Sequence, residues 1–309
     1  MIVNVSGIWE LAIEVHATFL EDIINAGLLT LNGSELNDKL YDFIISNRAI
    51  IVRGEPGELE ECIEDYMQRF KYKLERKRAA EKLKELFDYA SFSQKSEKLW
   101  SAYQLCSLAI YKVCCYCNLV ATDTCLPDED NKGYRPPIDH YYGKAEYPFL
   151  ALTLSNFIPC CEKCNGSQMK GVIDFSKIPH LHPLIDDESI DFDLVSTNPA
   201  SNSIAEFATL NMYKDEYRLA LNIGANAEKA AQSIKTFQLS SRYNHYSGAA
   251  YRLAKVMRGV ASRLEMHNDT FEFDVSIADY LGFEPDEYKN TPYGKVGVCI
   301  AEKFGRLKT

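Results

Sequence analysis

The sequence predicts an α+β protein that is mostly helical, and three observations lead to this prediction. Apolar residues recur at helical spacing before residue 110 and again after Tyr217. Between these regions lie two Cys-x-x-Cys pairs, Cys114/Cys117 and Cys161/Cys164. Short apolar runs typical of strands accompany the second pair. We therefore expect a helical N-terminal region over residues 1–110, a small finger over 111–183, and a small hairpin followed by helices over 184–309.

The N-terminal region divides into several predicted elements. An apolar stripe over residues 11–24 predicts a first helix, and residues 40–45 predict a short second one. Residues 49–53 form a short apolar run that suits either a strand or the buried end of a helix. Residues 58–89 predict one long helix, or two in line, with the acidic start that the helix dipole favours. Residues 98–113 predict an apolar helix that anchors the finger.

The middle of the predicted 58–89 helix is strongly basic. Its cationic residues are Arg69, Lys71, Lys73, Arg76, Lys77, Arg78, Lys82 and Lys84. One interpretation is a solvated helix face, in which a favourable Lys77/Glu81 pair is partly cancelled by the like-charge pair Glu81/Glu85; such faces are the more common case. The other is a surface that tracks phosphate groups toward the finger.

The net charge limits how the protein binds nucleic acid. It is −10, from 34 Lys and Arg against 44 Asp and Glu. Phosphate affinity depends on Lys and Arg displacing counterions, so this balance has the wrong sign for a protein that coats nucleic acid. Binding to nucleic acid then requires a local basic face or a partner protein that supplies the affinity.

The N-terminal segment does not have the features of a targeting signal. Residues 8–20 are rich in apolar side chains, but Glu10, Glu14 and His16 interrupt them, and no basic start or small-residue cleavage site is present. We therefore predict neither a signal peptide nor a transmembrane span, and we expect a cytoplasmic protein.

The cysteine content points to metal binding. The chain has ten cysteines, and in a reducing compartment clustered cysteines indicate metal sites before disulfides. Cys62, Cys106 and Cys299 lie in apolar helical contexts, where a free cysteine behaves as a small hydrophobic residue. Three further cysteines lie near the two pairs and remain alternative ligands: Cys115, Cys125 and Cys160.

The two Cys-x-x-Cys pairs together supply four thiolates. Four thiolates form a closed tetrahedral site of the structural type, and sulfur ligands select zinc over hard cations. A plain zinc ribbon has roughly 15 to 20 residues between its pairs. The stretch from Cys117 to Cys161 is much longer and contains Asp139 and His140, which favours an additional function for the finger.

The segment between the pairs carries residues suited to catalysis. Pro136 and Pro137 fix an extended entry to a predicted strand over residues 138–140. Residues 157–158 predict a second strand, and residues 162–170 predict a helix that presents Asn165. Neighbouring side chains in a strand point to opposite faces, so Asp139 and His140 have different tasks. An Asp beside a His, with an Asn on the next helix, suits magnesium held by oxygen ligands and an imidazole that deprotonates water.

Asp139, His140, Asn156 and Asn165, with the flanking cysteines, resemble the HNH nuclease motif, the ββα-metal finger, in its zinc-knuckle form. The resemblance covers roughly residues 111–183. It implies that His140 is the general base for phosphodiester hydrolysis, and that Asp139 and Asn165 hold a catalytic Mg²⁺ or Mn²⁺. It also implies that Asn156 holds the loop that orients the base. The metal ligands of the structural zinc are then Cys114, Cys117, Cys161 and Cys164.

One position departs from the family pattern. The family commonly has a lysine that contacts phosphate in an Asn-x-x-Lys spacing, but here Gln168 stands at that place. Lys170, two residues later, is the candidate for this contact. His180 and His182 follow the finger closely, but the motif requires neither, so both stay unassigned.

A fainter resemblance lies in the C-terminal region. Residues 236–239 with Tyr243, and residues 292–295, are similar to the helical tails of bacterial HNH proteins in antiphage systems, including the HNH effectors of Septu and of Septu-type retrons. This resemblance implies an antiviral defence nuclease that acts on DNA or transfer RNA and is controlled by a partner ATPase. Such a partner would also account for the acidic net charge.

A different class of function remains open. The finger can be a non-catalytic zinc-knuckle module that binds a partner protein or nucleic acid. Dependence on a divalent metal discriminates the two interpretations, because binding through zinc and basic helices needs no magnesium.

Overall fold

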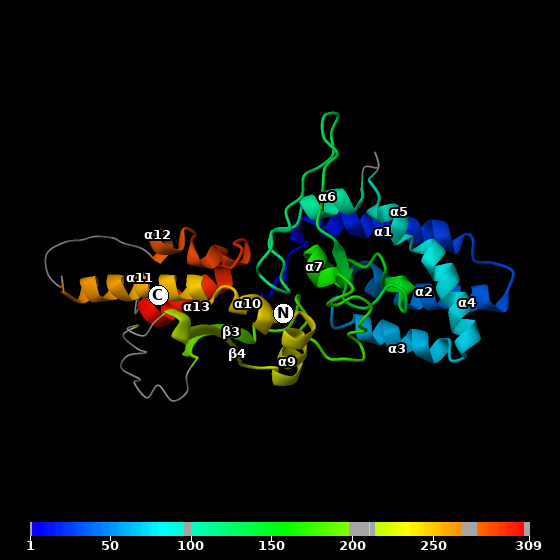
Figure 1. The fold of residues 1–309 in the computed structure, drawn as a ribbon. Helices are drawn as coiled ribbons and strands as arrows, with labels where there is room; N and C mark the ends of the chain where they lie inside the picture. The colour runs from blue at the N-terminus through cyan, green and yellow to red at the C-terminus, as the bar shows by residue number, and fades with distance from the viewer. Residues whose placement is uncertain (1, 96–99, 198–209, 211–213, 267–276, 306–309) are drawn as a thin grey trace. The chain divides into compact units, whose positions relative to one another are not determined.

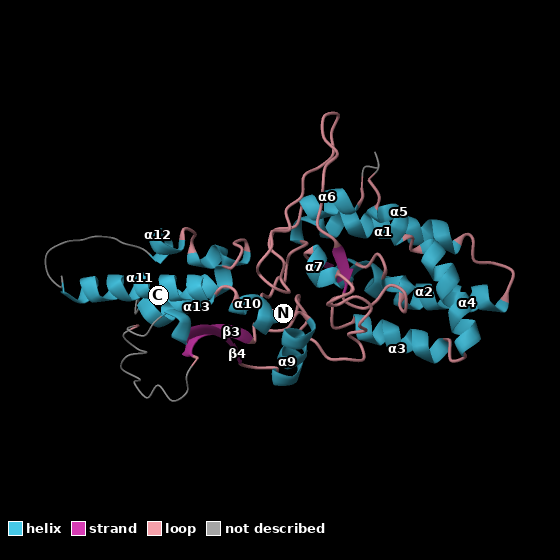
Figure 2. Cartoon of the chain, in the orientation of Figure 1, coloured by secondary structure: helices cyan, strands magenta, loops and turns pink. Residues whose placement is uncertain are grey.

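The computed structural model describes residues 2–95, 100–197, 210, 214–266 and 277–305, with the side chains of 260–266 left aside. The described chain is mostly helical and has two small antiparallel sheets (Figures 1 and 2). It forms two compact units. The finger unit contains residues 5–111 and 122–185, and the C-terminal unit contains residues 1–4, 112–121 and 186–309. None of the described helices is both long enough and apolar enough to cross a membrane.

The helical part of the finger unit follows the predicted order. Its elements are η1 (Glu10–Ala12), α1 (Ile13–Leu28), α2 (Glu35–Arg53), α3 (Leu59–Arg69), α4 (Lys73–Leu86), α5 (Tyr89–Ser93) and α6 (Ala102–Ser107). α2 begins at Ser34, whose Oγ accepts a hydrogen bond from the Asn37 amide at 3.2 Å, as expected of an N-cap. The apolar run over 49–53 is therefore the buried end of a helix that also includes residues 40–45.

The predicted 58–89 helix is broken between α3 and α4. Phe70 ends α3 and is fully buried against Tyr66 and Phe43. Arg76 of α4 donates to the carbonyl oxygens of Phe70 and Lys71, at 2.9 and 3.0 Å. These bonds satisfy carbonyl groups that the end of α3 leaves without helical partners. Arg76, one of the cationic residues of the predicted basic face, thus stabilises the connection between α3 and α4.

The predicted anchor helix over residues 98–113 was too long. The structure has only α6 there, over Ala102–Ser107, and residues 96–99 lie outside the described part. After α6 the Ile110 amide donates to the Ile8 carbonyl oxygen at 3.1 Å. This bond to a segment about a hundred residues earlier replaces a helical one, so tertiary pairing ends the helix early.

Aromatic side chains join the helices and the finger in one core. Phe149 belongs to η2 (Pro148–Leu150), in the loop between the two finger strands. Its ring centre lies 5.0 Å from that of Phe43 in α2 and 4.8 Å from that of Tyr66 in α3. All three side chains are fully buried. The finger therefore packs on the N-terminal helices and shares their core.

His16 of α1 is a buried polar residue in the same unit. Its Nε2 lies 2.7 Å from the Leu152 carbonyl oxygen, and Trp100 Nε1 donates to its Nδ1 at 3.1 Å. This arrangement requires a neutral imidazole with the proton on Nε2. Burial lowers the pKa of His16 to about 4, although the bond to Leu152 opposes the shift.

We expect the His16→Gln variant to lose less of its free energy of unfolding in acid than the wild type does. Because the pKa of His16 is lower in the folded state, its stabilising effect is complete above pH 6.5 and is lost as the pH falls toward 4. Glutamine can make both hydrogen bonds but does not titrate. Between pH 7 and 4.5 the wild type should lose about 2 kcal/mol more of its free energy of unfolding than the variant. Urea unfolding at both pH values measures this difference, with His245→Gln at an exposed site as the control; equal losses would contradict it.

The C-terminal unit is built on a hairpin of β3 (Ile190–Ser196) and β4 (Tyr217–Ile223). The strands are antiparallel, with Ile190 opposite Ile223 and Ser196 opposite Tyr217. The alternation of residues 192–195 and 206–212 suggests that these two segments form the hairpin. β3 pairs with β4 at residues 217–223, and all of 206–212 except Leu210 lies outside the described residues. Alternation of buried Tyr217 and Leu219 with exposed Arg218 shows why this later segment is the strand.

Helices complete the C-terminal unit. They are α9 (Ala227–Thr236), α10 (Leu239–Asn244), α11 (Ser247–Met266), α12 (Ile277–Leu281), η5 (Pro285–Lys289) and α13 (Gly294–Gly305). The apolar spacing over residues 239–266 predicts one long helix, which the structure divides into α10 and α11. α13 packs against both α11 and β3, and the three lie together in Figure 1.

The first cysteine pair is a packing centre of the C-terminal unit. Tyr116 stacks on Phe237 with ring centres 4.4 Å apart, and the Tyr243 hydroxyl donates to the Cys117 carbonyl oxygen at 2.5 Å. The Asn118 carbonyl accepts from the Tyr293 amide, and its Oδ1 accepts from the Lys295 amide at 2.9 Å. Both segments whose sequence resembles nuclease tails, residues 236–243 and 292–295, therefore contact this knuckle directly.

Replacing Asn118 should destabilise the C-terminal unit. Asn118 is fully buried with φ of 47°, a left-handed conformation that alanine adopts only with strain. Asn118→Ala loses the side-chain hydrogen bonds and adds this strain, so we expect a loss of about 2–3 kcal/mol. Asn118→Gly loses the same bonds without the strain and should cost about 1 kcal/mol less. Chemical denaturation measures the free energy of unfolding of both variants. Equal losses would show that the left-handed conformation of residue 118 does not contribute to the difference.

Candidate functional site

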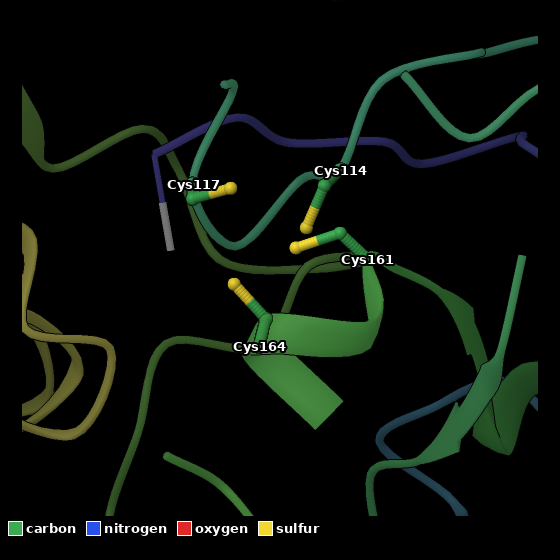
Figure 3. A group of neighbouring side chains, drawn as sticks. All are labelled: Cys114, Cys117, Cys161 and Cys164. Atoms are coloured by element: carbon green, nitrogen blue, oxygen red, sulfur yellow. The ribbon is translucent and has the colours of Figure 1, made fainter. Parts of the chain in front are cut away.

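Four cysteines converge as the sequence predicts. The Sγ atoms of Cys114, Cys117, Cys161 and Cys164 all lie within 4.8 Å of one another, and all four residues are buried. Figure 3 shows their sulfur atoms pointing toward a common centre, with Cys161 and Cys164 at the beginning and middle of one helical turn. Tetrahedral zinc with Zn–S bonds of about 2.3 Å places its sulfurs about 3.8 Å apart. The donor set and its spacing fit zinc.

The remaining cysteines do not belong to this group. Cys115 and Cys160 are buried next to ligand positions, and Cys125 is partly exposed near Asn131. Of the three cysteines predicted to lie in the core, Cys62 and Cys106 are fully buried, whereas Cys299 is only half-buried. None of the ten cysteines, all of which lie in the described part of the chain, forms a disulfide. Cys115, Cys125 and Cys160, the alternative zinc ligands, are therefore not among the four cysteines that the fold brings together.

The finger consists of two short strands followed by a short helix. β1 (Ile138–His140) pairs with β2 (Phe157–Pro159) in antiparallel register, with His140 opposite Phe157. α7 (Glu162–Asn165) follows, and the Asn165 amide donates to the Cys161 carbonyl oxygen at 3.1 Å. Both strands lie where the sequence predicts them. α7 ends five residues earlier than predicted, because Gly166 leaves the helical conformation and residues 166–171 fold into turns.

Asn156 fastens the loop that joins the two strands. Its Oδ1 accepts from the Tyr142 amide at 2.7 Å, and its Nδ2 donates to the carbonyl oxygens of Tyr142 and Leu150, both at 3.0 Å. The side chain is fully buried. These three bonds fix both ends of the loop segment between Tyr142 and Leu150. Asn156 is thus placed to shape the site without lining it.

His140 is held in a fixed orientation by aromatic rings and by one hydrogen bond. Its Nε2 lies 2.9 Å from the Ala151 carbonyl oxygen. The rings of Tyr89 and Phe157 meet the imidazole edge-on, with centres 4.5 and 5.2 Å away. Burial lowers the pKa of His140 to about 3, and the positive charge of Lys144 adds to this shift. The imidazole is therefore neutral near pH 7, as a general base must be, but a pKa this low makes it a weaker proton acceptor than an ordinary histidine.

Asp139 is ion-paired inside the protein. Lys170 Nζ donates to Asp139 Oδ1 at 2.6 Å, and both side chains are buried. Lys170 is therefore not presented to solvent for a phosphate contact, in contrast to the expectation from the family motif. Gln168, at the family's usual lysine position, is exposed.

One pocket of the finger unit brings the predicted catalytic residues together. Its lining includes Asp139, His140, Asn165 and Lys170. Asn165 is half-buried at the end of α7 and lines this pocket. Carboxylate and amide oxygens are the donors that Mg²⁺ and Mn²⁺ prefer. The residues of this pocket fit a hard divalent cation beside a neutral imidazole.

Lys144 is a member of the pocket that the sequence reasoning did not single out. Its Nζ lies 4.6 Å from the centre of the Tyr89 ring, a cation–π contact. Desolvation of this ammonium lowers the pKa of Lys144; Asp139 opposes the shift, while the nearby charges of Lys170 and Lys84 add to it. The signal was hidden because Tyr89 and Lys144 are far apart in the sequence, and only the tertiary fold makes them neighbours.

The basic helix α4 reaches this region at one end. α4 packs on η2 in the finger loop, and Lys84 acts electrostatically on Lys144. Lys77, Arg78, Lys82 and Lys84 are exposed. The exposed positions of these cationic residues are compatible with the predicted surface that tracks phosphate groups toward the finger. That function stays a prediction.

His180 and His182 lie outside the cysteine group and take part in ring packing. His180 stacks on Phe175, and His182 packs on Tyr141, each with ring centres 3.9 Å apart. His182 Nδ1 accepts from the Leu184 amide at 3.1 Å. Their observed contacts are those of residues that support the finger.

Comparison with known proteins finds one informative similarity. The chain is 22% identical over 200 residues to the protein named "Septu protein PtuB" of Bacillus thuringiensis, which covers 62% of this chain and 73% of the relative. No protein-family model matches the chain. No solved structure matches it either.

Proposed function

We propose that the chain is a divalent-metal-dependent endonuclease of the HNH type that hydrolyses phosphodiester bonds of DNA or transfer RNA. The observation that carries this proposal is the pocket lined by Asp139, His140 and Asn165, beside a loop that Asn156 fastens. The four-cysteine group supports it, because the sequence motif combines such a knuckle with these residues. The finger's strand, loop, strand and helix order supports it further.

In the proposed mechanism, Asp139 and Asn165, which line the same pocket, would hold Mg²⁺ or Mn²⁺. When bound, the metal ion polarises the scissile phosphate and stabilises the leaving oxygen. His140 takes a proton from the attacking water. Donation from His140 Nε2 to the Ala151 carbonyl oxygen leaves Nδ1 with the lone pair that accepts this proton. The rings of Tyr89 and Phe157 hold the imidazole plane, so the base does not have to be ordered during the reaction.

The biological setting that we propose is antiphage defence. The similarity to a protein named for the Septu system supports it, together with the tail segments that resemble Septu-type effectors. In this setting a partner protein, in our proposal an ATPase, restrains the nuclease until infection. The net charge of −10 supports a need for such a partner, because the chain alone has little general attraction for nucleic acid.

The test is a cleavage assay with the purified chain on plasmid DNA and on total transfer RNA. We expect cleavage of at least one substrate with Mg²⁺ or Mn²⁺ and none with EDTA. The alternative, a non-catalytic zinc-knuckle module, predicts nucleic-acid or partner binding that does not change when magnesium is removed. Binding of this kind without cleavage, also in the presence of the ATPase partner that we propose, would overturn the proposal.

A further inference from the structure

The Lys170 ammonium contacts Asp139, one of the two residues that would hold the metal. Nζ donates to Asp139 Oδ1 at 2.6 Å and to the His140 carbonyl oxygen at 2.5 Å. It also lies 4.8 Å from the centre of the Phe175 ring. The side chains of Lys170 and Asp139 are 4% and 5% exposed. The pair is therefore a buried ion pair. Among the described residues, the next most buried lysine–carboxylate pair is Lys295–Glu188, with side chains 12% and 15% exposed.

The backbone after α7 fixes Lys170 in this position. The Lys170 amide donates to the carbonyl oxygen of Cys164 at 3.2 Å, and the Gly171 amide donates to that of Gly166 at 3.1 Å. Gly171 has φ of 47°, in the left-handed region that allows this reversal. The turn therefore directs the side chain back toward β1, and the ammonium has little freedom to leave Asp139.

This position makes Lys170 a competitor of a divalent cation. The ammonium offsets the charge of Asp139, the carboxylate that we propose as the charged metal ligand. A cation on the same carboxylate would lie a few ångströms from Lys170 in a partly desolvated site, where like charges repel strongly. Lys144 in the same lining adds a further positive charge.

Removing the lysine would have the opposite electrostatic effect. A buried carboxylate without its partner is strongly destabilising. A bound divalent cation can compensate such a carboxylate and thereby stabilise the folded state. Loss of Lys170 should therefore couple the stability of the finger unit to the metal, which an ordinary packing role of the lysine would not do.

We propose that Lys170 is a built-in counter-cation for Asp139: it keeps the metal-free site folded and keeps the affinity for a divalent cation low. This inference rests on the proposed function, since it takes Asp139 as a metal ligand. Lys170 is a positioning residue in this account. Phosphate groups of a substrate then raise the local metal affinity, because they restore negative charge beside the pair.

The test is Mn²⁺ binding without nucleic acid, measured by calorimetry and by the paramagnetic signal of free Mn²⁺. We expect Lys170→Met to bind Mn²⁺ about tenfold or more tightly than the wild type. In buffer without added divalent cation, which leaves the structural zinc in place, we also expect its melting temperature to lie below that of the wild type. Addition of Mn²⁺ should restore it, while the melting temperature of the wild type changes little. If Lys170→Met does not fold, Lys170→Gln is used, because glutamine can still donate to the His140 carbonyl.

Two controls separate the possible results. Lys163→Met removes the same charge at an exposed position of α7 and should leave Mn²⁺ affinity unchanged. Asp139→Asn combined with Lys170→Met should not bind Mn²⁺ at this site. If wild-type Mn²⁺ binding depends on Asp139 but Lys170→Met binds Mn²⁺ no more tightly than the wild type, the role of Lys170 is overturned. The proposed metal site would still stand in that case. Absence of Asp139-dependent binding in every variant would overturn the proposed metal site as well.

Discussion

Replacing His140 by alanine should reduce the rate of metal-dependent cleavage by about 10²- to 10⁴-fold, the range of a lost general base. The variant removes the neutral imidazole that the rings of Tyr89 and Phe157 hold in the pocket. It leaves the four cysteines and Asn156 in place. We therefore expect an unchanged zinc content, so that the loss is one of chemistry.

The matched control is His245→Ala. His245 is an exposed histidine of the C-terminal unit, and its replacement should leave cleavage unchanged. Circular dichroism and zinc analysis of both variants exclude unfolding as the cause. Cleavage at the wild-type rate by a folded His140→Ala protein would remove His140 from the mechanism.

Cys161→Ser should have the largest effect on folding. The thiolate is one of four that meet within 4.8 Å, and it also stands immediately before α7, which carries Asn165. The free energy of zinc binding is folding free energy in small metal sites. We expect a loss of about 4 kcal/mol or more and of the bound zinc. Zinc analysis and thermal unfolding measure the two quantities.

Cys160→Ser is the appropriate comparison. Cys160 is equally buried and adjacent in sequence, but it is not one of the four converging thiols. This variant should retain zinc and lose only the stability expected of a polar atom in the core. A Cys161→Ser protein that is fully folded without zinc would show that the cysteines do not form the structural centre of the finger.

Parts of the finger could be predicted because local rules determine them. Pro136 and Pro137 impose an extended conformation, and β1 begins directly after them at Ile138. The Cys-x-x-Cys spacing allows two thiols to reach one metal ion from a single turn. The four-cysteine convergence is accordingly confirmed by the structure.

Other features depend on contacts between distant segments and have no local signal. The helix over 98–113 is shortened because Ile110 bonds to Ile8, and the pocket acquires Lys144 through its contact with Tyr89. Burial of Lys170 depends on the turn that follows α7. Apolar periodicity reflects the composition of these segments but not their partners. The phosphate contact considered for Lys170 came from the resemblance to the HNH motif, from which the spacing of this lysine departs.

The most direct test of the central claim is the cleavage rate as a function of Mn²⁺ concentration for the wild type, Asn165→Ala and His140→Ala. If Asn165 is a metal ligand and His140 the base, Asn165→Ala should need more Mn²⁺ for half-maximal cleavage. His140→Ala should instead have a lower maximal rate at every Mn²⁺ concentration. Cleavage by the wild type in EDTA, or full activity of His140→Ala, would contradict a metal-dependent nuclease at this site.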